Sequence, residues 1–226
     1  MNELKRLLLN TFVVGNRYQY FLNGLGMTLL LTFSSFLLGT ALGVALCAAM
    51  RSENAAVRRA TGIIKSFFVQ LPTLVLLMIM VYVVFGQSAL PILVIVIVGL
   101  TLKAAAYLAE IFDAALSTVQ PGEVEAARTL GMNRWQAFRF VALPQTVAAA
   151  LPLYQNQFVA TMQETSVVGY LAVVDLTRAF SIVSSRTLDA FVGLFTITVI
   201  YFLIGAVVKG LFRLVARQMR KGGEGA

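Results

Sequence analysis

The sequence predicts an all-α integral membrane protein with about five transmembrane helices, and three observations carry that prediction. Of the 226 residues, 59% are hydrophobic and only 12% are charged, and the mean hydropathy is +0.83. A soluble domain is about 45–50% apolar and about 25% charged, and a core of this size could not hide the excess. The apolar residues also form runs of about 20 or more, long enough to span a bilayer, and basic residues gather between the runs.

Composition also narrows the function classes. The formal net charge is +8, which basic cytoplasmic loops explain better than nucleic-acid binding does, so we expect no nucleic-acid partner. The one cysteine, Cys47, lies in an apolar run and has no partner for an internal disulfide. The chain contains no histidine, which removes His-based catalytic triads and His metal sites. We therefore predict no catalytic residue and no metal site.

Residues 1–21 are predicted to form an amphipathic N-terminal segment that stays on the protein. Lys5 and Arg6 precede a short apolar stretch, but Asn16 and Arg17 follow it where a cleaved signal peptide would have small residues. A transmembrane domain is then expected over residues 22–214.

The first predicted span covers residues 22–50. Within it, Ser35, Gly39 and Gly43 recur every four residues and therefore share one helix face. Small residues on one face let a second helix approach closely. The alternative is that these glycines only reflect the composition of membrane helices.

The second predicted span covers residues 62–85 and the third covers residues 92–119. Pro72 lies inside the second span, frees a backbone carbonyl and is expected to kink the helix. The fourth and fifth spans are expected at 147–168 and 188–211, separated by the less apolar stretch 169–186. A basic, Gly-rich cytoplasmic tail follows at 215–226, and its end is expected to be disordered.

A polar segment, residues 120–144, separates the third and fourth spans. Pro121 and Gly122 end the third span, and Glu123 and Glu125 are expected in the first turn of a short helix, where negative charge suits the helix dipole. The apolar face of this helix is expected to comprise Ala126, Ala127 and Leu130.

Gly131 is predicted to end that short helix, and Asn133 to cap a second one that contains Trp135 and is closed by Pro144. We expect the two helices to lie across the inner membrane face at roughly a right angle. Periodicity alone leaves open whether their apolar face contacts a protein partner or lipid headgroups.

The distribution of basic residues predicts the orientation. Membrane proteins concentrate Lys and Arg in cytoplasmic loops. With the N-terminus outside and the C-terminus in the cytoplasm, twelve basic residues lie inside and five lie outside, which puts the segment 120–144 in the cytoplasm. The inside set is Arg51, Arg58, Arg59, Lys65, Arg128, Arg134, Arg139, Lys209, Arg213, Arg217, Arg220 and Lys221; the outside set is Lys5, Arg6, Arg17, Arg178 and Arg186.

The segment 120–144 resembles the EAA loop of bacterial ABC importer permeases. That motif reads Glu-Ala-Ala, three residues, Gly, nine residues and Ile-x-Leu-Pro. Here Glu125-Ala126-Ala127, Gly131 and the run from Val141 to Pro144 keep that spacing, with Val141 in place of Ile. Other stretches, such as "NGLGMTLLLT", "AAYLAEIF" and "ETSVVGYLAVVDLTRA", resemble the polar amino-acid subgroup, so the resemblance covers roughly residues 23–214.

This resemblance implies a transport subunit in a bacterial cytoplasmic membrane that is not itself an enzyme. A second permease subunit, identical or related, would complete the pore among membrane lipids, and a periplasmic or extracellular solute-binding protein would deliver a polar amino acid. Partner ATPase subunits would bind ATP and Mg, since the chain lacks the phosphate-loop pattern and needs no cofactor of its own. The residues that the resemblance assigns to ATPase coupling are Glu125, Ala126, Ala127, Leu130 and Gly131.

Three departures from the subgroup stand in the sequence, and the last of them, near the expected substrate path, leaves the particular amino acid open. Val69-Gln70-Leu71 stands where an Arg-Gly-Thr-like stretch precedes the proline, Glu123 replaces a Gln, and Gln163 replaces a Lys before Glu164-Thr165-Ser166. Permeases for methionine or organosulfur compounds share the EAA spacing and stay an alternative. A secondary transporter without an ATPase is a further alternative.

Polar residues within the spans are candidates for a substrate path. Lys103, Tyr107 and Glu110 stand at i, i+4 and i+7 and share one helix face. Charges at membrane depth are costly and usually face a cavity or a partner. Lys103 could bind a substrate carboxylate, and Glu110 or Glu164 its ammonium, with Tyr107, Gln163 and Ser166 alongside. The alternative is that Lys103 only neutralises Glu110, Asp113 or Glu164.

Overall fold

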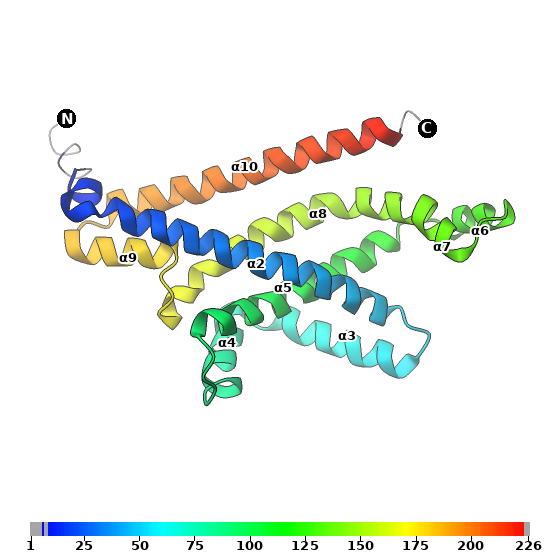
Figure 1. Cartoon of the computed structure of the whole chain (residues 1–226), viewed down its shortest axis with the longest axis horizontal. Coiled ribbons are helices and arrows are strands. Elements are labelled where there is room, and N and C mark those ends of the chain that lie inside the picture. The colour runs from blue at the N-terminus through cyan, green and yellow to red at the C-terminus, as the bar shows by residue number, and fades with distance from the viewer. Residues whose placement is uncertain (1–5, 7–8, 224–226) are drawn as a thin grey trace.

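A computed structural model describes residue 6 and residues 9–223, and its secondary structure is helical (Figure 1). Four long helices run along the long axis of the molecule: α2 (Tyr18–Met50), α5 (Ile92–Leu116), α8 (Leu143–Glu164) and α10 (Phe191–Gly223). The start of α2 and helix α9 (Leu176–Thr187) lie toward one end of this axis. Toward the other end lie the short helices α6 (Pro121–Thr129) and α7 (Arg134–Ala137), the turn between α2 and α3 (Ala55–Gln70), and the end of α10.

Three helices in the described part of the chain are long and apolar enough to span a membrane. They are α2 (Tyr18–Met50), α5 (Ile92–Leu116) and the first part of α10, Phe191–Leu214. Two bent helix pairs pass the same test together, which raises the number of spans to five if each pair is one span. The prediction of an all-α membrane protein is therefore confirmed, with three clear spans and up to five.

Helices α2 and α5 pack along the small-residue face predicted from the sequence. A Cβ atom on Gly39 would lie 2.8 Å from the Cβ of Ala104, and one on Gly43 would lie 2.9 Å from the Cβ of Leu108. Ser35 is fully buried on the same face. Because the two backbones approach this closely, these positions exclude even a methyl group without rearrangement.

The second predicted span corresponds to two helices at a sharp angle rather than to one kinked helix. Helix α3 (Ala55–Gln70) begins at Asn54, whose side chain accepts a hydrogen bond from the Ala56 amide at 2.9 Å. Leu71 then adopts an extended conformation before Pro72, and α4 (Thr73–Met78) with the π-helical turn η3 (Ile79–Val84) leaves at 107° to α3. A residue that precedes proline is pushed out of the helical region, and proline donates no amide hydrogen bond, so the helix ends here.

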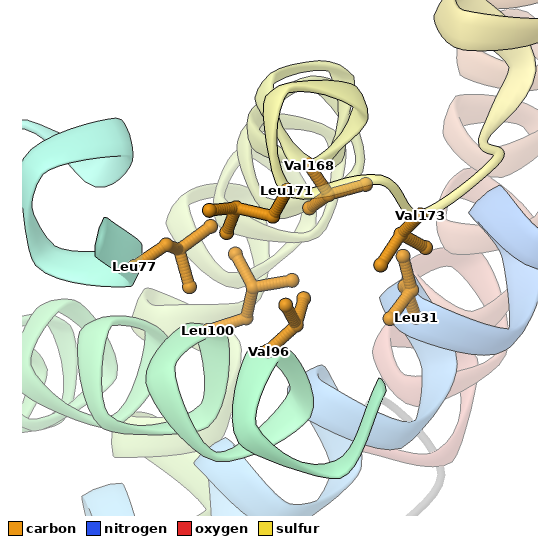
Figure 2. Packing of buried hydrophobic residues seen from close by; sticks show 7 residues of the cluster. All are labelled: Leu31, Leu77, Val96, Leu100, Val168, Leu171 and Val173. Atoms are coloured by element: carbon orange, nitrogen blue, oxygen red, sulfur yellow. The ribbon is translucent and has the colours of Figure 1, made fainter. Parts of the chain in front are cut away.

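A buried cluster holds this break against the rest of the bundle (Figure 2). Leu77 of α4 lies close to Leu100 of α5, and Leu171 and Val168 of the 3₁₀ segment η5 (Thr165–Leu171) cover them. The cluster comprises Leu31, Leu77, Val96, Leu100, Val168, Leu171 and Val173. It therefore joins the broken span to α2, α5 and the end of the fourth span.

The prediction that Pro144 closes a separate short helix is wrong. Helix α7 (Arg134–Ala137) continues through the π-helical turn η4 (Phe138–Ala142) into α8 (Leu143–Glu164), and one helical run extends over Arg134–Leu171. Pro144 lies in the first turn of α8. The wider π-helical turn directly before it accommodates a residue that would otherwise end an α-helix.

The remaining boundaries differ from the expectations in smaller ways. Helix α2 begins four residues before residue 22, after a short π-helical and 3₁₀ segment at residues 9–16. Helix α9 (Leu176–Thr187) begins within the stretch 169–186 and ends one residue beyond it, and the buried side chain of Asp175 caps it. Helix α10 (Phe191–Gly223) continues through most of the expected tail, so the structure gives residues 215–223 as helix; residues 224–226 lie outside the described residues.

Candidate functional site

Helix α6 (Pro121–Thr129) is the short helix predicted between the third and fourth spans. Proline at its first position suits a helix start, and the Glu123 amide donates to the Gln120 carbonyl at 3.1 Å. Glu123 lies in the first turn, but Glu125 does not, because the helix begins at Pro121. The Glu123 carboxylate accepts a hydrogen bond from the side-chain amide of Gln145, which joins α6 to α8.

The turn after α6 has the geometry that the residue types predicted. Gly131 has φ +93°, a value that favours glycine, and the Met132 amide donates to the Ala127 carbonyl at 3.2 Å. Asn133 and Gln136 then form a reciprocal capping box, with two hydrogen bonds of 2.9 Å. Both predicted boundary residues, Gly131 and Asn133, are confirmed.

The apolar residues of this segment do not share one environment. Ala127 is buried, whereas Ala126 is exposed and Leu130 is 84% exposed. Trp135 and Phe140, on the helix that follows, are also exposed. Ala127 therefore packs within the chain, whereas Ala126, Leu130, Trp135 and Phe140 remain exposed.

A second group of predicted residues gathers at the Pro72 break. Lys103 is 3% exposed, and its ammonium donates to the Leu71 carbonyl. The Tyr107 hydroxyl donates to the Val69 carbonyl at 3.2 Å. The last carbonyls of a helix have no amide donor within the helix. The two side chains of α5 supply donors to such carbonyls at the C-terminal end of α3.

Glu164 reaches the same region from the end of α8. Its carboxylate interacts electrostatically with Lys103 and faces the side chain of Thr73, the first residue of α4. Its Oε2 atom is buried and forms no hydrogen bond within the described part of the chain. An unpaired buried carboxylate oxygen is costly unless a ligand or a partner completes it.

The other predicted path residues lie elsewhere. Glu110 is on the same face of α5 but pairs with Lys65 of α3, at 3.6 Å between Nζ and Oε2. Gln163 is exposed and lines a cavity of about 410 Å³, shared with Tyr201, Lys209 and Arg213 of α10. Ser166 is half-buried in η5. Asp113, one of the partners considered for Lys103, instead pairs with Arg51 at 2.7 Å.

Sequence reasoning missed the backbone partner of Lys103. The only available signal was that one predicted span contains a lysine and the span before it contains a proline, which frees backbone carbonyls. The sequence does not state that these two spans are neighbours at that depth, so the pairing required the structure.

Comparison with known proteins identifies the family. Residues 39–221 match the family described as the inner membrane component of binding-protein-dependent transport systems. The chain is 31% identical to the probable amino-acid ABC transporter permease YckA of Bacillus subtilis, over 88% of this chain and 89% of that protein. It is 30% identical to HisM of Salmonella typhimurium, a histidine/lysine/arginine/ornithine transport system permease, over the same shares of the two chains.

Solved structures give the same result. A chain in the crystal structure of an amino acid ABC transporter with histidines superposes with a TM-score of 0.81 at 30% identity, covering 89% of this chain and 94% of that one. A chain of the inward-facing MetNI methionine ABC transporter has a TM-score of 0.75 at 20% identity, which shows the fold alone. The chain described here belongs to the family of inner-membrane components of binding-protein-dependent transport systems.

Proposed function

We propose that this chain is the membrane-spanning subunit of an ATP-driven importer that carries a polar amino acid across a bacterial cytoplasmic membrane. The observation that carries this proposal is similarity over most of the chain to permeases named for amino-acid transport, in sequence and in fold. A transport subunit of this family works with an ATPase and a solute-binding protein. A second permease subunit completes the pore.

Helix α6 and the turn at Gly131 form the contact with the ATPase. The exposed Leu130, together with the exposed apolar residues that follow the turn, offers an apolar surface for a protein partner. The hydrogen bond between Gln145 and Glu123 joins this surface to α8. ATP and Mg are bound by the partner, and its movement reaches the spans through α6.

The orientation follows from the same arrangement. The end of the molecule that holds α6, the α2–α3 turn and the C-terminal end of α10 is cytoplasmic, and the end that holds α9 faces outward (Figure 1). This matches the charge rule, since the elements at the cytoplasmic end carry most of the basic residues.

The substrate path passes the Pro72 break. Glu164 binds the substrate ammonium, because its buried Oε2 is the polar atom there without a partner among the described residues. Lys103 stabilises the conformation of the break through its hydrogen bond to the Leu71 carbonyl, and it adds positive charge near the substrate carboxylate. Tyr107 supports it through Val69. Glu110, Gln163 and Ser166 stay predicted members of the path, outside this cluster.

The ATPase contact is tested by Leu130→Asp. A charge in the centre of an apolar contact should abolish copurification of the ATPase subunits and uptake, while insertion of the permease stays normal. Leu188→Asp is the matched control, because Leu188 is 93% exposed in the turn before α10, at the opposite end of the molecule. Copurification of the ATPase with Leu130→Asp at the level of the parent would refute the contact.

The substrate path is tested by comparing Glu164→Gln with Lys103→Met. Glu164→Gln should keep membrane yield and thermal stability but lose substrate-stimulated ATPase activity in the reconstituted complex. Lys103→Met should lose the stimulated ATPase activity and should also lower membrane yield and thermal stability. The second effect is expected because the variant leaves the Leu71 carbonyl without its donor, at a cost of about 1–3 kcal/mol. Normal stimulation with unchanged apparent affinity in Glu164→Gln would remove this carboxylate from the path.

A further inference from the structure

One guanidinium joins the cytoplasmic ends of α2 and α5. Arg51 is the C-cap residue of α2. Its Nε donates to Asp113 Oδ1 at 2.7 Å, and its Nη2 donates to the Asp113 carbonyl at 2.9 Å and to Ser117 Oγ at 2.6 Å. The planar fork of arginine suits such a set of acceptors, and the carboxyl end of α5 favours a positive charge.

Ser117 connects this contact to the α5 backbone. Its hydroxyl accepts from Arg51 and donates to the Asp113 carbonyl at 2.9 Å. Ser117 is also the C-cap residue of α5, so the contact holds the last turn of that helix and not only one side chain.

The contact lies next to the start of α6. Only residues 118–120 separate Ser117 from Pro121, and this linker is hydrogen-bonded: the Thr118 amide donates to the Ala115 carbonyl at 3.2 Å, and the Glu123 amide to the Gln120 carbonyl at 3.1 Å. A tight linker of this length leaves α6 little freedom to move without the end of α5. A displacement of α6 therefore reaches Ser117 and Asp113 directly.

On the other side, Arg51 leads into the broken span. Helix α3 begins four residues after Arg51, and the Arg58 side chain donates to the Ser52 carbonyl at 3.2 Å across the turn. Helix α3 ends at the break that Lys103 and Tyr107 hold. The end of α2 is thus connected to the start of α6 through Asp113 and Ser117, and to the break through α3.

We propose that Arg51 is a positioning residue that makes α2 and α3 follow the movement of α6 during transport. This inference rests on the proposed role of α6 as the ATPase contact. A purely stabilising role is a weak explanation of the contact, because the two side chains are 41% and 38% exposed and exposed ion pairs contribute little to folding stability. The three hydrogen bonds of one guanidinium instead fix the orientation of the end of α2 relative to the end of α5.

The test uses the full importer, reconstituted in vesicles with its ATPase subunits and solute-binding protein. The readout is the number of ATP molecules hydrolysed per amino acid taken up, which a loss of folded protein alone would not change. Arg51→Met and Asp113→Ala should each raise this number at least threefold. Arg51→Lys should give an intermediate value, since one ammonium cannot reproduce the fork.

A double-mutant cycle makes the test specific to the contact. If the two residues act through their contact, Arg51→Met combined with Asp113→Ala should be no worse than Arg51→Met alone. Arg59→Met is the matched control: Arg59 is an exposed cation near the N-terminal end of α3 with no side-chain hydrogen bond among the described residues, so its ratio should equal that of the parent.

The outcomes separate this inference from the proposed function. If Leu130→Asp in the same assay keeps ATPase binding and uptake, the proposed role of α6 fails, and this inference fails with it. If Leu130→Asp abolishes both while Arg51→Met keeps the parent ratio, only the role of Arg51 is refuted. Independent, multiplying effects of Arg51→Met and Asp113→Ala would also refute it.

Discussion

At the scale of single residues, two positions show what residue type reveals and what it hides. Gly131 was predicted to end α6, and its φ of +93° confirms that the position favours glycine. Lys103 was predicted to be functional or paired with a carboxylate, and it donates instead to the Leu71 carbonyl. A backbone conformation can be deduced from the residue that tolerates it, whereas a partner on another helix depends on packing that the sequence does not state.

Gly131→Ala should weaken coupling without preventing insertion. An alanine forced into a left-handed conformation costs about 1–2 kcal/mol, so the turn between α6 and α7 populates other conformations. We expect amino-acid uptake to fall about fivefold or more at equal membrane level. Gly122→Ala is the control, since Gly122 has no positive φ and a Cβ there meets no atom within 4 Å. Equal uptake by the two variants would contradict this account of the turn.

At the scale of helices, periodicity predicted which face of a helix is packed more reliably than the prolines predicted where a helix ends. The spacing of Ser35, Gly39 and Gly43 predicted a close helix contact, which the structure confirms between α2 and α5. Pro72 was expected to kink a span and instead separates two helices by 107°, whereas Pro144 was expected to end a helix and lies inside a continuous one. The residue type is the same, but the extended Leu71 precedes the first proline and a π-helical turn precedes the second.

Gly39→Ala should lower the thermal stability of the purified permease. Its methyl group would lie 2.8 Å from the Cβ of Ala104, and overpacking of this kind typically costs about 1–3 kcal/mol. Gly26→Ala, in the same helix, is the matched control: a Cβ there meets nothing within 4 Å, and alanine favours a helix more than glycine does. The melting temperature measured in detergent should therefore fall for Gly39→Ala and rise for Gly26→Ala. A change in the same direction for both variants would argue against the close contact.

At the scale of the whole molecule, composition together with the length of the apolar runs and the basic residues between them was enough to predict a helical membrane protein. The apolar runs gave the positions of the three clear spans to within a few residues at most ends, although α10 continues well past the predicted end of the fifth span. What composition could not predict is that two further apolar helix pairs are sharply bent, because the bends depend on contacts such as those of Leu77 with α5. The grouping of Lys103, Tyr107 and Glu164 at one break has the same origin.

The proposed orientation can be checked by cysteine labelling in a Cys47→Ala background. Glu53→Cys and Ser185→Cys both replace exposed residues, in the α2–α3 turn and in α9 respectively. A membrane-impermeant thiol reagent added to intact cells should label Ser185→Cys only, and Glu53→Cys should react after the cells are opened. Labelling of Glu53→Cys in intact cells would invert the topology.

The continuous helical run Arg134–Leu171 has a mechanical consequence. At about 1.5 Å per residue it is roughly 57 Å long, and it begins beside α6 and ends in the cluster that covers the Pro72 break. If it moves as a rigid rod held near its α6 end, a tilt of only about 5° displaces Leu171 by about 5 Å, close to the pitch of one helical turn. A small rotation imposed at one face of the membrane is thereby amplified into a shift large enough to repack the side chains near the other.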